Sequence, residues 1–316
     1  MPALTSFQAQ EHPLDVLSFF MAQESAGKRC ALAMLTATEG GSVRAPGALM
    51  AVTEDGQSCG YLSGGCIDAD VRLHARSCLK TGRGQTLRYG KGSPFLDIAL
   101  PCGGAIEVSI FPLPDKAIIS AAIDALTNRR PTSFAPFDGP DALIAYYRPK
   151  LRLRIAGRSA DPLALARISV AAGIETALWS PDPACLANAK TIEGLTTVPL
   201  TSPTALPQIT DDGATAFVLM MHDQDWESAL LAPALAGNAF YVGAVGSPHT
   251  HVKRRAHLAN QGLPASEIDR IHAPIGLVPS LRDASMLAIS TLAEIIGTFH
   301  TAPTEHIANQ KAFENV

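Results

Sequence analysis

The stretch LRLRIAGRSADPLALARISVAAGIETALW, residues 151–179, decides the fold of the second half of the chain. It reads as a buried strand over 151–156, a helix over 162–172 and a second strand over 174–179, which together predict a β-α-β unit. Further strands are expected over 216–221 and 239–245, with helices over 225–236, 249–261 and 283–299. Because strands alternate with helices, we predict an α/β, Rossmann-like domain over 151–316 with a doubly wound parallel sheet.

The first half of the chain carries a different pattern, which predicts an N-terminal α+β domain over residues 1–128. Helices are expected over 13–27, from Cys66 to Lys80 (closed by Gly82) and over 115–128, and strands over 30–37, 48–53, 86–89 and 105–111. The stretch RRPTSFAPFDGPD at 129–141 carries three prolines and predicts a linker with little regular structure, which extends over 129–150. A strand near 142–147 is compatible with either domain.

Composition limits the classes of protein to which this chain can belong. Its 316 residues suit two domains of about 150 residues each. A net charge of -4 disfavours a nucleic-acid partner, because such a surface must be basic to displace counterions. Neither a signal peptide nor an apolar run of roughly 18 residues is read. We therefore expect a cytoplasmic protein with no membrane partner, whose six cysteines are reduced thiols.

The first candidate site is the glycine-rich stretch GGSVRAPGALMAVTEDGQSCGYLSGGC, residues 40–66, in which seven of 27 residues are glycine. It ends in Ser63, Gly64, Gly65 and Cys66 at an expected helix start. Free amides and the helix dipole favour an anion there, and the same dipole favours the thiolate of a first-turn cysteine. The alternative is a tight turn followed by a packed cysteine, which is the commoner case.

A second cysteine adjoins paired glycines in Leu100-Pro101-Cys102-Gly103-Gly104, just before an expected strand. Taken alone, this pattern is most often a turn that leads into a strand. Two such clusters in one domain favour a shared pocket. The absence of a C-x-x-C pair argues against a structural zinc site.

Two turns in the second half are candidate phosphate sites. The turn after the strand at 151–156 retains only Gly157 of the G-x-G-x-x-G pattern, although Asp182 stands where a ribose-binding acid is expected, so the pattern supports bound NAD(P) only weakly. The turn at Gly246 and Ser247 opens a helix whose first half is basic and includes Arg254, which suits a phosphate. A solvated basic helix face is the alternative.

Histidines in the second half carry weaker signals. His249, His251 and His257 do not fall on one helical face, so no metal site is expected there. His222 and Asp225 follow a strand and suggest metal binding or acid–base work. Helix capping by Asp223 or Asp225 is the commoner role for such a pair. Walker A, G-x-S-x-G and H-E-x-x-H patterns are absent from the sequence.

The motifs together resemble a known family. GGSVRAPGALMAVTEDGQSCGYLSGGCIDADV (40–71) and LPCGGAIEV (100–108) look like the two signatures of the XdhC/CoxI family of xanthine dehydrogenase accessory proteins. The second half resembles the Rossmann-like domain of that family at the stretches MHDQDWESALL (221–231), YVGAVGSPHTHVKRR (241–255), PIGL (274–277) and AISTLAEII (288–296). The resemblance covers nearly the whole chain in the right order.

The resemblance implies an accessory chaperone that binds molybdenum cofactor, supports its sulfuration and inserts it into an apoenzyme of the xanthine dehydrogenase/aldehyde oxidase family. It also implies a cysteine desulfurase as sulfur donor, and we allow for a homodimer. The family motifs fall on two groups of residues. Cys66 and Cys102 are the candidate reactive thiols, and the candidate cofactor contacts are Ser63, Gly64, Gly65, Gly103, Gly104, Gly246, Ser247 and Arg254. Thiolates suit molybdenum or sulfur as soft ligands, and glycine amides suit a phosphate.

The sequence departs from the family pattern at two places in the second domain. Gly157-Arg158-Ser159-Ala160 replaces a Gly-Ala-Gly-His-like turn, and residues 279–285 replace a Gly-Ala-x-Thr-Pro-Glu-Glu run. Both departures weigh against a nucleotide in this domain. Two other functions stay open, namely an NAD(P)-dependent oxidoreductase built on the second domain and a scaffold that docks a sulfur donor without holding cofactor.

Overall fold

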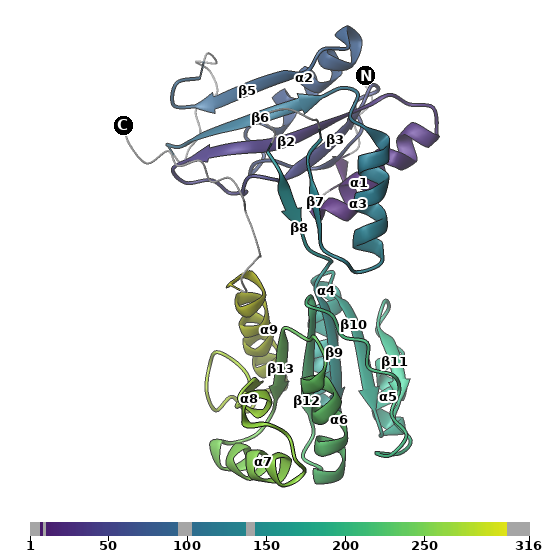
Figure 1. Cartoon of the computed structure of the whole chain (residues 1–316), viewed down its shortest axis with the longest axis vertical. Helices are drawn as coiled ribbons and strands as arrows, with labels where there is room; N and C mark the ends of the chain where they lie inside the picture. The colour runs from purple at the N-terminus through teal and green to yellow at the C-terminus, as the bar shows by residue number, and fades with distance from the viewer. Residues whose placement is uncertain (1–6, 9–10, 94–102, 137–142, 302–316) are drawn as a thin grey trace. The chain divides into compact units, whose positions relative to one another are not determined.

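The computed structural model describes residues 7–8, 11–93, 103–136 and 143–301. The chain divides into two compact units, with the boundary between Pro149 and Lys150 (Figure 1). None of the helices in the described ranges is long and apolar enough to cross a membrane.

The N-terminal unit is built on a mixed sheet of order β1-β4-β3-β2-β6-β5. Its ladders are antiparallel except for the parallel pair of β1 and β4. Along β2 the side chains alternate between two apolar clusters, one under α2 and one under α1 and α3, so both faces are covered. The strands and helices are β1 (Phe7–Gln8), β2 (Cys30–Glu39), β3 (Leu49–Thr53), β4 (Ser58–Gly60), β5 (Gln85–Gly90), β6 (Ala105–Phe111), α1 (Pro13–Ser25), α2 (Asp68–Thr81) and α3 (Lys116–Thr127).

The predicted linker over 129–150 is wrong, because much of it belongs to the N-terminal unit. It contains β7 (Thr132–Phe134) and β8 (Ala145–Tyr147), which pair in antiparallel fashion. Phe134 and Tyr147 are buried in the cluster under α1 and α3, and the Tyr147 hydroxyl donates a 2.8 Å hydrogen bond to the carbonyl of Gly47. Burial of these aromatic rings outweighs the turn preference of the neighbouring prolines. Residues 137–142 of the predicted linker lie outside the described residues.

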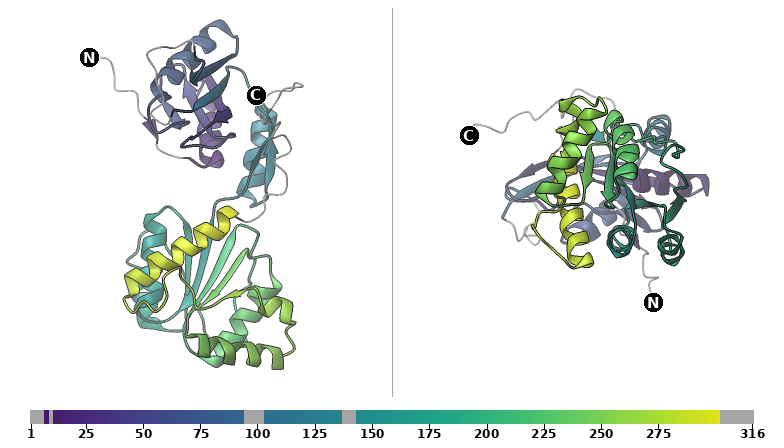
Figure 2. Two further views of the ribbon diagram at one scale, coloured as in Figure 1. Left: turned by 90° about the vertical axis from the view of Figure 1, so that its left-hand side faces the viewer. Right: turned by 90° about the horizontal axis from the view of Figure 1, so that it is seen from below.

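The C-terminal unit has the predicted doubly wound architecture. All six strands are parallel, in the order β11-β10-β9-β12-β13-β14. Helices α4, α5 and α9 pack on one face and α6, α7 and α8 on the other, as Figure 2 shows. The elements are β9 (Arg152–Gly157), α4 (Ala160–Ala171), β10 (Glu175–Ser180), α5 (Pro183–Ala189), β11 (Thr196–Pro199), β12 (Thr215–Met220), α6 (Gln224–Ala236), β13 (Tyr241–Ala244), α7 (Pro248–Asn260), α8 (Ala265–Ile268), β14 (Ile271–His272) and α9 (Ala284–Thr301).

This strand order is that of a Rossmann fold. The first three strands are added toward one edge of the sheet, and the fourth returns to the other side of the first strand. Here the first and fourth strands are β9 and β12, which pair from Arg152 with Thr215 to Gly157 with Met220. Ligands of such sheets bind outside the carboxyl ends of the strands at that reversal. The segments that follow β9, β12 and β13 are therefore the places to search for a site in this unit.

Candidate functional site

Several loops of the N-terminal unit leave its sheet at the same end. Glu39, the last residue of β2, pairs with Ala105, the first of β6, and Gly90 at the end of β5 pairs with the same residue. Gly60, the last residue of β4, pairs with Met50 near the start of β3. The glycine-rich segment that follows β2, the segment that follows β4 and the described residues that precede β6 therefore share one end of the sheet. The first glycine-cysteine motif lies there, as do Gly103 and Gly104 of the second.

Hydrogen bonds to Asp68 fix the loop that carries the first motif. Its carboxylate accepts the Leu62 amide at 2.7 Å, the Ser63 hydroxyl at 2.6 Å and the Gly65 amide at 3.1 Å. The Ser63 hydroxyl in turn accepts the amides of Gly65 and Ile67. Asp68 and Ser63 are both buried. The anion at the start of α2 is thus the protein's own carboxylate, so the prediction that the Gly65 amide is open to a ligand phosphate is wrong.

Cys66 lies just before α2 rather than in its first turn. The helix begins at Asp68 with Ile67 as its N-cap, because the Asp68 network turns the chain before the helical hydrogen bonds start. The prediction of a first-turn cysteine is therefore wrong. Gly82 ends the helix in the left-handed conformation, as predicted.

Exposure distinguishes Cys66 from the other cysteines that the structure describes. Cys66 is exposed, whereas Cys30, Cys59, Cys78 and Cys185 are buried. Burial raises the pKa of the Cys30 thiol to about 12 and that of Cys59 to about 11, and it also raises the pKa of Cys78 and Cys185. The packed-cysteine alternative is thus wrong for Cys66. Cys102 lies outside the described residues.

Close backbone packing joins the second glycine motif to the segment after β2. A Cβ placed on Gly104 would lie 2.5 Å from the carbonyl oxygen of Glu39 and 2.9 Å from that of Gly41. The same segment carries Val43, whose side chain lies 3.8 Å from where a Cβ of Gly64 would stand. Among the residues that the structure describes, none would lie within 4 Å of a Cβ on Gly65 or Gly103. Gly64 and Gly104 therefore contact one segment, while Gly65 and Gly103 leave open space beside the backbone.

A cation that the sequence analysis missed lies beside this loop. The Arg44 guanidinium stacks 4.2 Å from the ring centroid of Tyr61 and forms a 2.6 Å ion pair with Glu11. The Tyr61 hydroxyl also donates to Glu11. Tyr61 directly follows β4 and stands two residues before Ser63, so the positive charge borders the Cys66 loop. Arg44 belongs to the quoted glycine-rich stretch, and its charge within that stretch was the available signal.

In the C-terminal unit, an ion pair spans the carboxyl ends of β9 and β12. Arg158, directly after β9, bonds to Asp223 after β12 at 2.9 Å. Gly157 packs so closely that a Cβ would lie 2.6 Å from the carbonyl oxygen of Met220. Asp182 accepts the Ala184 amide as the N-cap of α5. Close strand packing and helix capping thus account for Gly157 and Asp182 without a dinucleotide.

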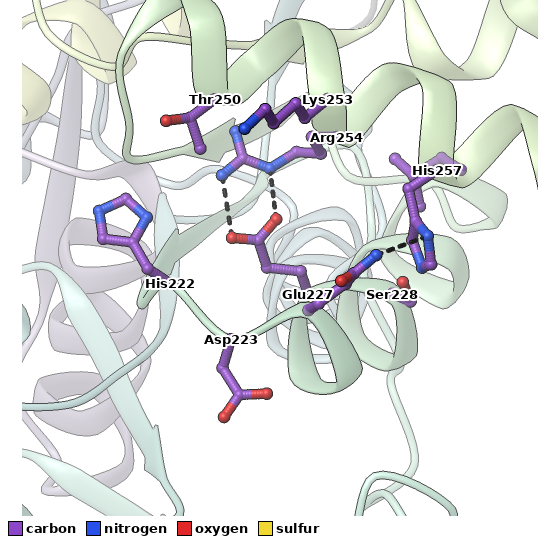
Figure 3. Close-up of a pocket in the computed structure, with 10 residues that line it drawn as sticks. His222, Asp223, Glu227, Ser228, Thr250, Lys253, Arg254 and His257 are labelled. Carbon is purple, nitrogen blue, oxygen red and sulfur yellow. Dashed lines mark hydrogen bonds and ion pairs between the residues drawn. The ribbon is translucent and has the colours of Figure 1, made fainter.

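The structure separates the residues predicted to bind a phosphate at α7. Ser247 caps the helix by accepting the Thr250 amide, and together with Gly246 it lines a cavity of 520 Å³. Arg254 lines a different cavity of 290 Å³, between α6 and α7 (Figure 3). Its side chain is 2% exposed and pairs with Glu227, so the alternative of a solvated basic face is wrong at this position. No local sequence pattern pointed to Glu227 as the partner of Arg254.

Asp223 and His257 have local roles. Asp223 caps α6 by accepting the Trp226 amide, which confirms the capping interpretation of the His222 and Asp225 segment. The two ring nitrogens of His257 bond to Gln224 and Gln261. In the described part of the chain, no group of three His, Cys, Asp or Glu side chains is arranged to hold a metal ion.

Comparisons with known proteins agree with this architecture. Residues 24–90 match the XdhC and CoxI family, and residues 153–295 match the XdhC Rossmann domain. The chain is 33% identical over 296 residues to the molybdenum cofactor insertion chaperone PaoD of Escherichia coli (strain K12), covering 89% of this chain and 86% of that protein. A crystal structure from Bacillus halodurans, described as a xanthine dehydrogenase, superposes with a TM-score of 0.74 at 20% identity, covering 93% of this chain and 97% of that one, which shows a shared fold. The chain therefore belongs to the XdhC and CoxI family.

Proposed function

We propose that this protein is a chaperone that binds molybdenum cofactor and inserts it into a molybdoenzyme. The observation that carries the proposal is Cys66, an exposed thiol on a loop that the buried Ser63–Asp68 network holds in place. A thiolate is a soft ligand suited to molybdenum or to a sulfur atom bound to it. The name of PaoD, to which the chain is similar over most of its length, supports the same role.

The proposed binding surface comprises Gly64, Gly65, Cys66 and Gly103 at one end of the N-terminal sheet. Open space beside Gly65 and Gly103 leaves room for a flat ligand to approach the backbone. Because the Gly65 amide is already bonded, the phosphate of the cofactor needs another donor. Arg44 borders this loop, and its guanidinium would be shared between Glu11 and the phosphate. Ser63 and Gly104 then stabilise the loop that carries the binding surface and do not contact the cofactor themselves.

The finer steps are also part of the proposal. Cys66 and Cys102 together contact the molybdenum or its sulfur while a sulfido ligand replaces an oxo ligand, which takes up two protons and leaves as water. A cysteine desulfurase supplies the sulfur as a persulfide, a thiol reductant provides the two electrons that bring it to the sulfide level, and an apoenzyme of the xanthine dehydrogenase/aldehyde oxidase family receives the cofactor. A homodimer would place two such sites in one assembly.

An oxidoreductase that uses NAD(P) is the main alternative, and the geometry lends it little support. The parallel sheet has the strand order of dinucleotide-binding domains. However, the ion pair of Arg158 with Asp223 lies at the strand ends where a pyrophosphate would bind, and Asp182 is engaged as a helix cap. The cofactor-chaperone function accounts better for the exposed Cys66 loop of the N-terminal unit, and it does not require a dinucleotide in the C-terminal unit.

One purification experiment separates these functions. The full chain is produced in cells that make molybdenum cofactor, and the purified protein is assayed for molybdenum and for pterin fluorescence after release. We expect both in the wild-type protein, a large loss in Cys66→Ser, and retention in Cys185→Ser, which removes a buried thiol far along the chain. NAD(P) turnover without pterin would favour the oxidoreductase. Co-purification of a dehydrogenase without either ligand would favour a scaffold.

A further inference from the structure

One face of α7 is turned toward α6 across a small cavity at the carboxyl end of β12. Thr250, Lys253, Arg254 and His257 all line it, at spacings of three, four and seven residues that place them on one side of a helix. On α6 the lining residues include Glu227 and Ser228. Figure 3 shows these side chains around the same space. The cavity measures 290 Å³ and lies in the region of a doubly wound sheet where ligands collect.

Arg254 is a buried cation with one unused donor. Its Nε donates to Glu227 at 2.9 Å, and one terminal nitrogen, Nη2, donates to Glu227 at 3.2 Å and to the carbonyl of Val245 at 2.8 Å. The other terminal nitrogen, Nη1, is buried and has no hydrogen-bond partner. The hydroxyl of Ser228, on the opposite helix, is also buried and unpartnered. Two buried polar groups without protein partners, on residues that line one cavity, are unfavourable unless water or a polar ligand satisfies them.

The charge around the cavity favours an anion. Glu227 balances Arg254, and Asp223 is engaged with Arg158. Within the described ranges Lys253 forms no ion pair, so its charge on the cavity wall is not balanced by a neighbouring acid. Oxyanions of the phosphate type accept several hydrogen bonds at once, which suits Lys253, Nη1 of Arg254 and the Ser228 hydroxyl.

The space continues beyond the charged end. A second cavity of 490 Å³ shares Gln224, Ser228 and His257 with the first and extends toward Pro203 and Gln261. Its lining mixes apolar surface from Pro203 and Ala229 with the polar side chains of Thr204 and Gln261, and it includes one acidic residue, Asp225. A ligand seated at Lys253 would therefore have room for an uncharged, polar remainder.

We propose that this groove between α6 and α7 binds a small phosphorylated molecule, with the phosphate on Lys253, Arg254 and Ser228. Arg254 acts as a fixed donor, because Glu227 and the Val245 carbonyl already hold its guanidinium in place. The site is distinct from the Cys66 loop of the N-terminal unit and does not depend on molybdenum cofactor.

Calorimetric titration of the full chain with inorganic phosphate and with pyrophosphate, at constant ionic strength in chloride, tests this proposal. We expect saturable binding of pyrophosphate that weakens about tenfold in Lys253→Ala and in Ser228→Ala. Lys190→Ala removes an exposed lysine elsewhere in the same unit and should bind as the wild type does. Circular dichroism verifies that each variant is folded.

Two results would overturn the proposal. One is no saturable heat with either anion at millimolar concentration, which would leave water as the occupant of the cavity. The other is equal weakening in Lys190→Ala and Lys253→Ala, which would show non-specific attraction to positive charge. Loss of pterin and molybdenum from Cys66→Ser leaves this test unaffected, so the two proposals fail separately.

Discussion

The hydroxyl of Ser63 donates a 2.6 Å hydrogen bond to the carboxylate of Asp68, five residues further along the chain. The same carboxylate receives the amides of Leu62 and Gly65, so it holds both sides of the loop that presents Cys66. A carboxylate that accepts several bonds in a buried position rigidifies the segment around it. The exposed thiol is thus held on a fixed backbone, which is what pre-organised binding requires.

The first prediction concerns the stability of this loop. Asp68→Ala leaves buried donors without an acceptor, and we expect the free energy of unfolding of the N-terminal unit to fall by about 3 kcal/mol. Both tryptophans, Trp179 and Trp226, belong to the C-terminal unit. In urea titrations the far-UV circular dichroism should therefore show an earlier transition, while the tryptophan fluorescence transition stays in place.

Asp124→Asn is the matched control, because Asp124 is exposed on α3 of the same unit. It should change the free energy of unfolding by less than about 0.5 kcal/mol. Equal shifts of the circular dichroism and fluorescence transitions in Asp68→Ala would show that the network does not act locally.

The second prediction concerns thiol reactivity. Under native conditions at pH 8, iodoacetamide should modify Cys66 at least about ten times faster than the four buried cysteines, because only the exposed thiolate reacts readily. The raised pKa of Cys30, about 12, and of Cys59, about 11, reduces their thiolate fractions further. Peptide mass spectrometry at increasing times gives the individual rates. In urea the rates should converge, and native modification of Cys30 as fast as Cys66 would contradict the assignment.

Most of the fold could be predicted from the sequence, because buried positions carry apolar residues in the pattern that each helix or strand requires. Residues 216–221 are continuously apolar, and every residue of β12 is buried, as a central parallel strand requires. Strand β8 lies within the strand expected near 142–147, but β7 was missed because it is short and the prolines nearby dominate the local pattern. Helix α5 and strand β11 fell in a proline-rich interval for the same reason.

The candidate site was only partly predictable. Glycine and cysteine residues identified the two motifs, but the role of Asp68 depends on how the loop closes in space. The ion pair of Arg254 with Glu227 joins residues 27 positions apart on different helices, so no local pattern reveals it. The available signal was the spacing of Thr250, Lys253, Arg254 and His257 on one face of α7.

The third prediction concerns the packing between the two glycine motifs. Gly104→Ala would force a Cβ to within 2.5 Å of the Glu39 carbonyl oxygen, a backbone atom that cannot rotate away. We expect a loss of about 1–3 kcal/mol in the free energy of unfolding of the N-terminal unit, together with lower cofactor retention. Urea unfolding and the pterin assay measure the two effects.

Gly64→Ala is the control for this change, because its Cβ would make only an ordinary contact at 3.8 Å with Val43. Its free energy of unfolding should stay within about 0.5 kcal/mol of the wild type. Full stability and full retention in Gly104→Ala would mean that the segment after β2 moves freely, and that the two motifs are not coupled through it.

The last prediction uses the pH dependence of a cluster in the C-terminal unit. Glu294 on α9 bonds to His272 and accepts the Gly276 amide, and the Tyr241 ring stacks on His272 at 4.4 Å. Burial raises the pKa of Glu294, but the bonds from His272 and Gly276 outweigh it, so the pKa lies below its ordinary value of 4.5. A lowered pKa means that the folded state favours the charged carboxylate. Its stabilisation is therefore present above pH 4.5 and is lost as the pH falls through the folded-state pKa.

Glu294→Gln should thus lower the free energy of unfolding by about 1 kcal/mol near neutral pH, and this difference should shrink as the pH falls from 5 to 3. Urea unfolding followed by tryptophan fluorescence reports on the C-terminal unit, because Trp179 and Trp226 both lie in it. Glu193→Gln alters an exposed carboxylate of the same unit and should show a small difference at every pH. The prediction is contradicted if the difference in free energy of unfolding between wild type and Glu294→Gln grows toward pH 3. That result would mean that the cluster stabilises the protonated form of Glu294.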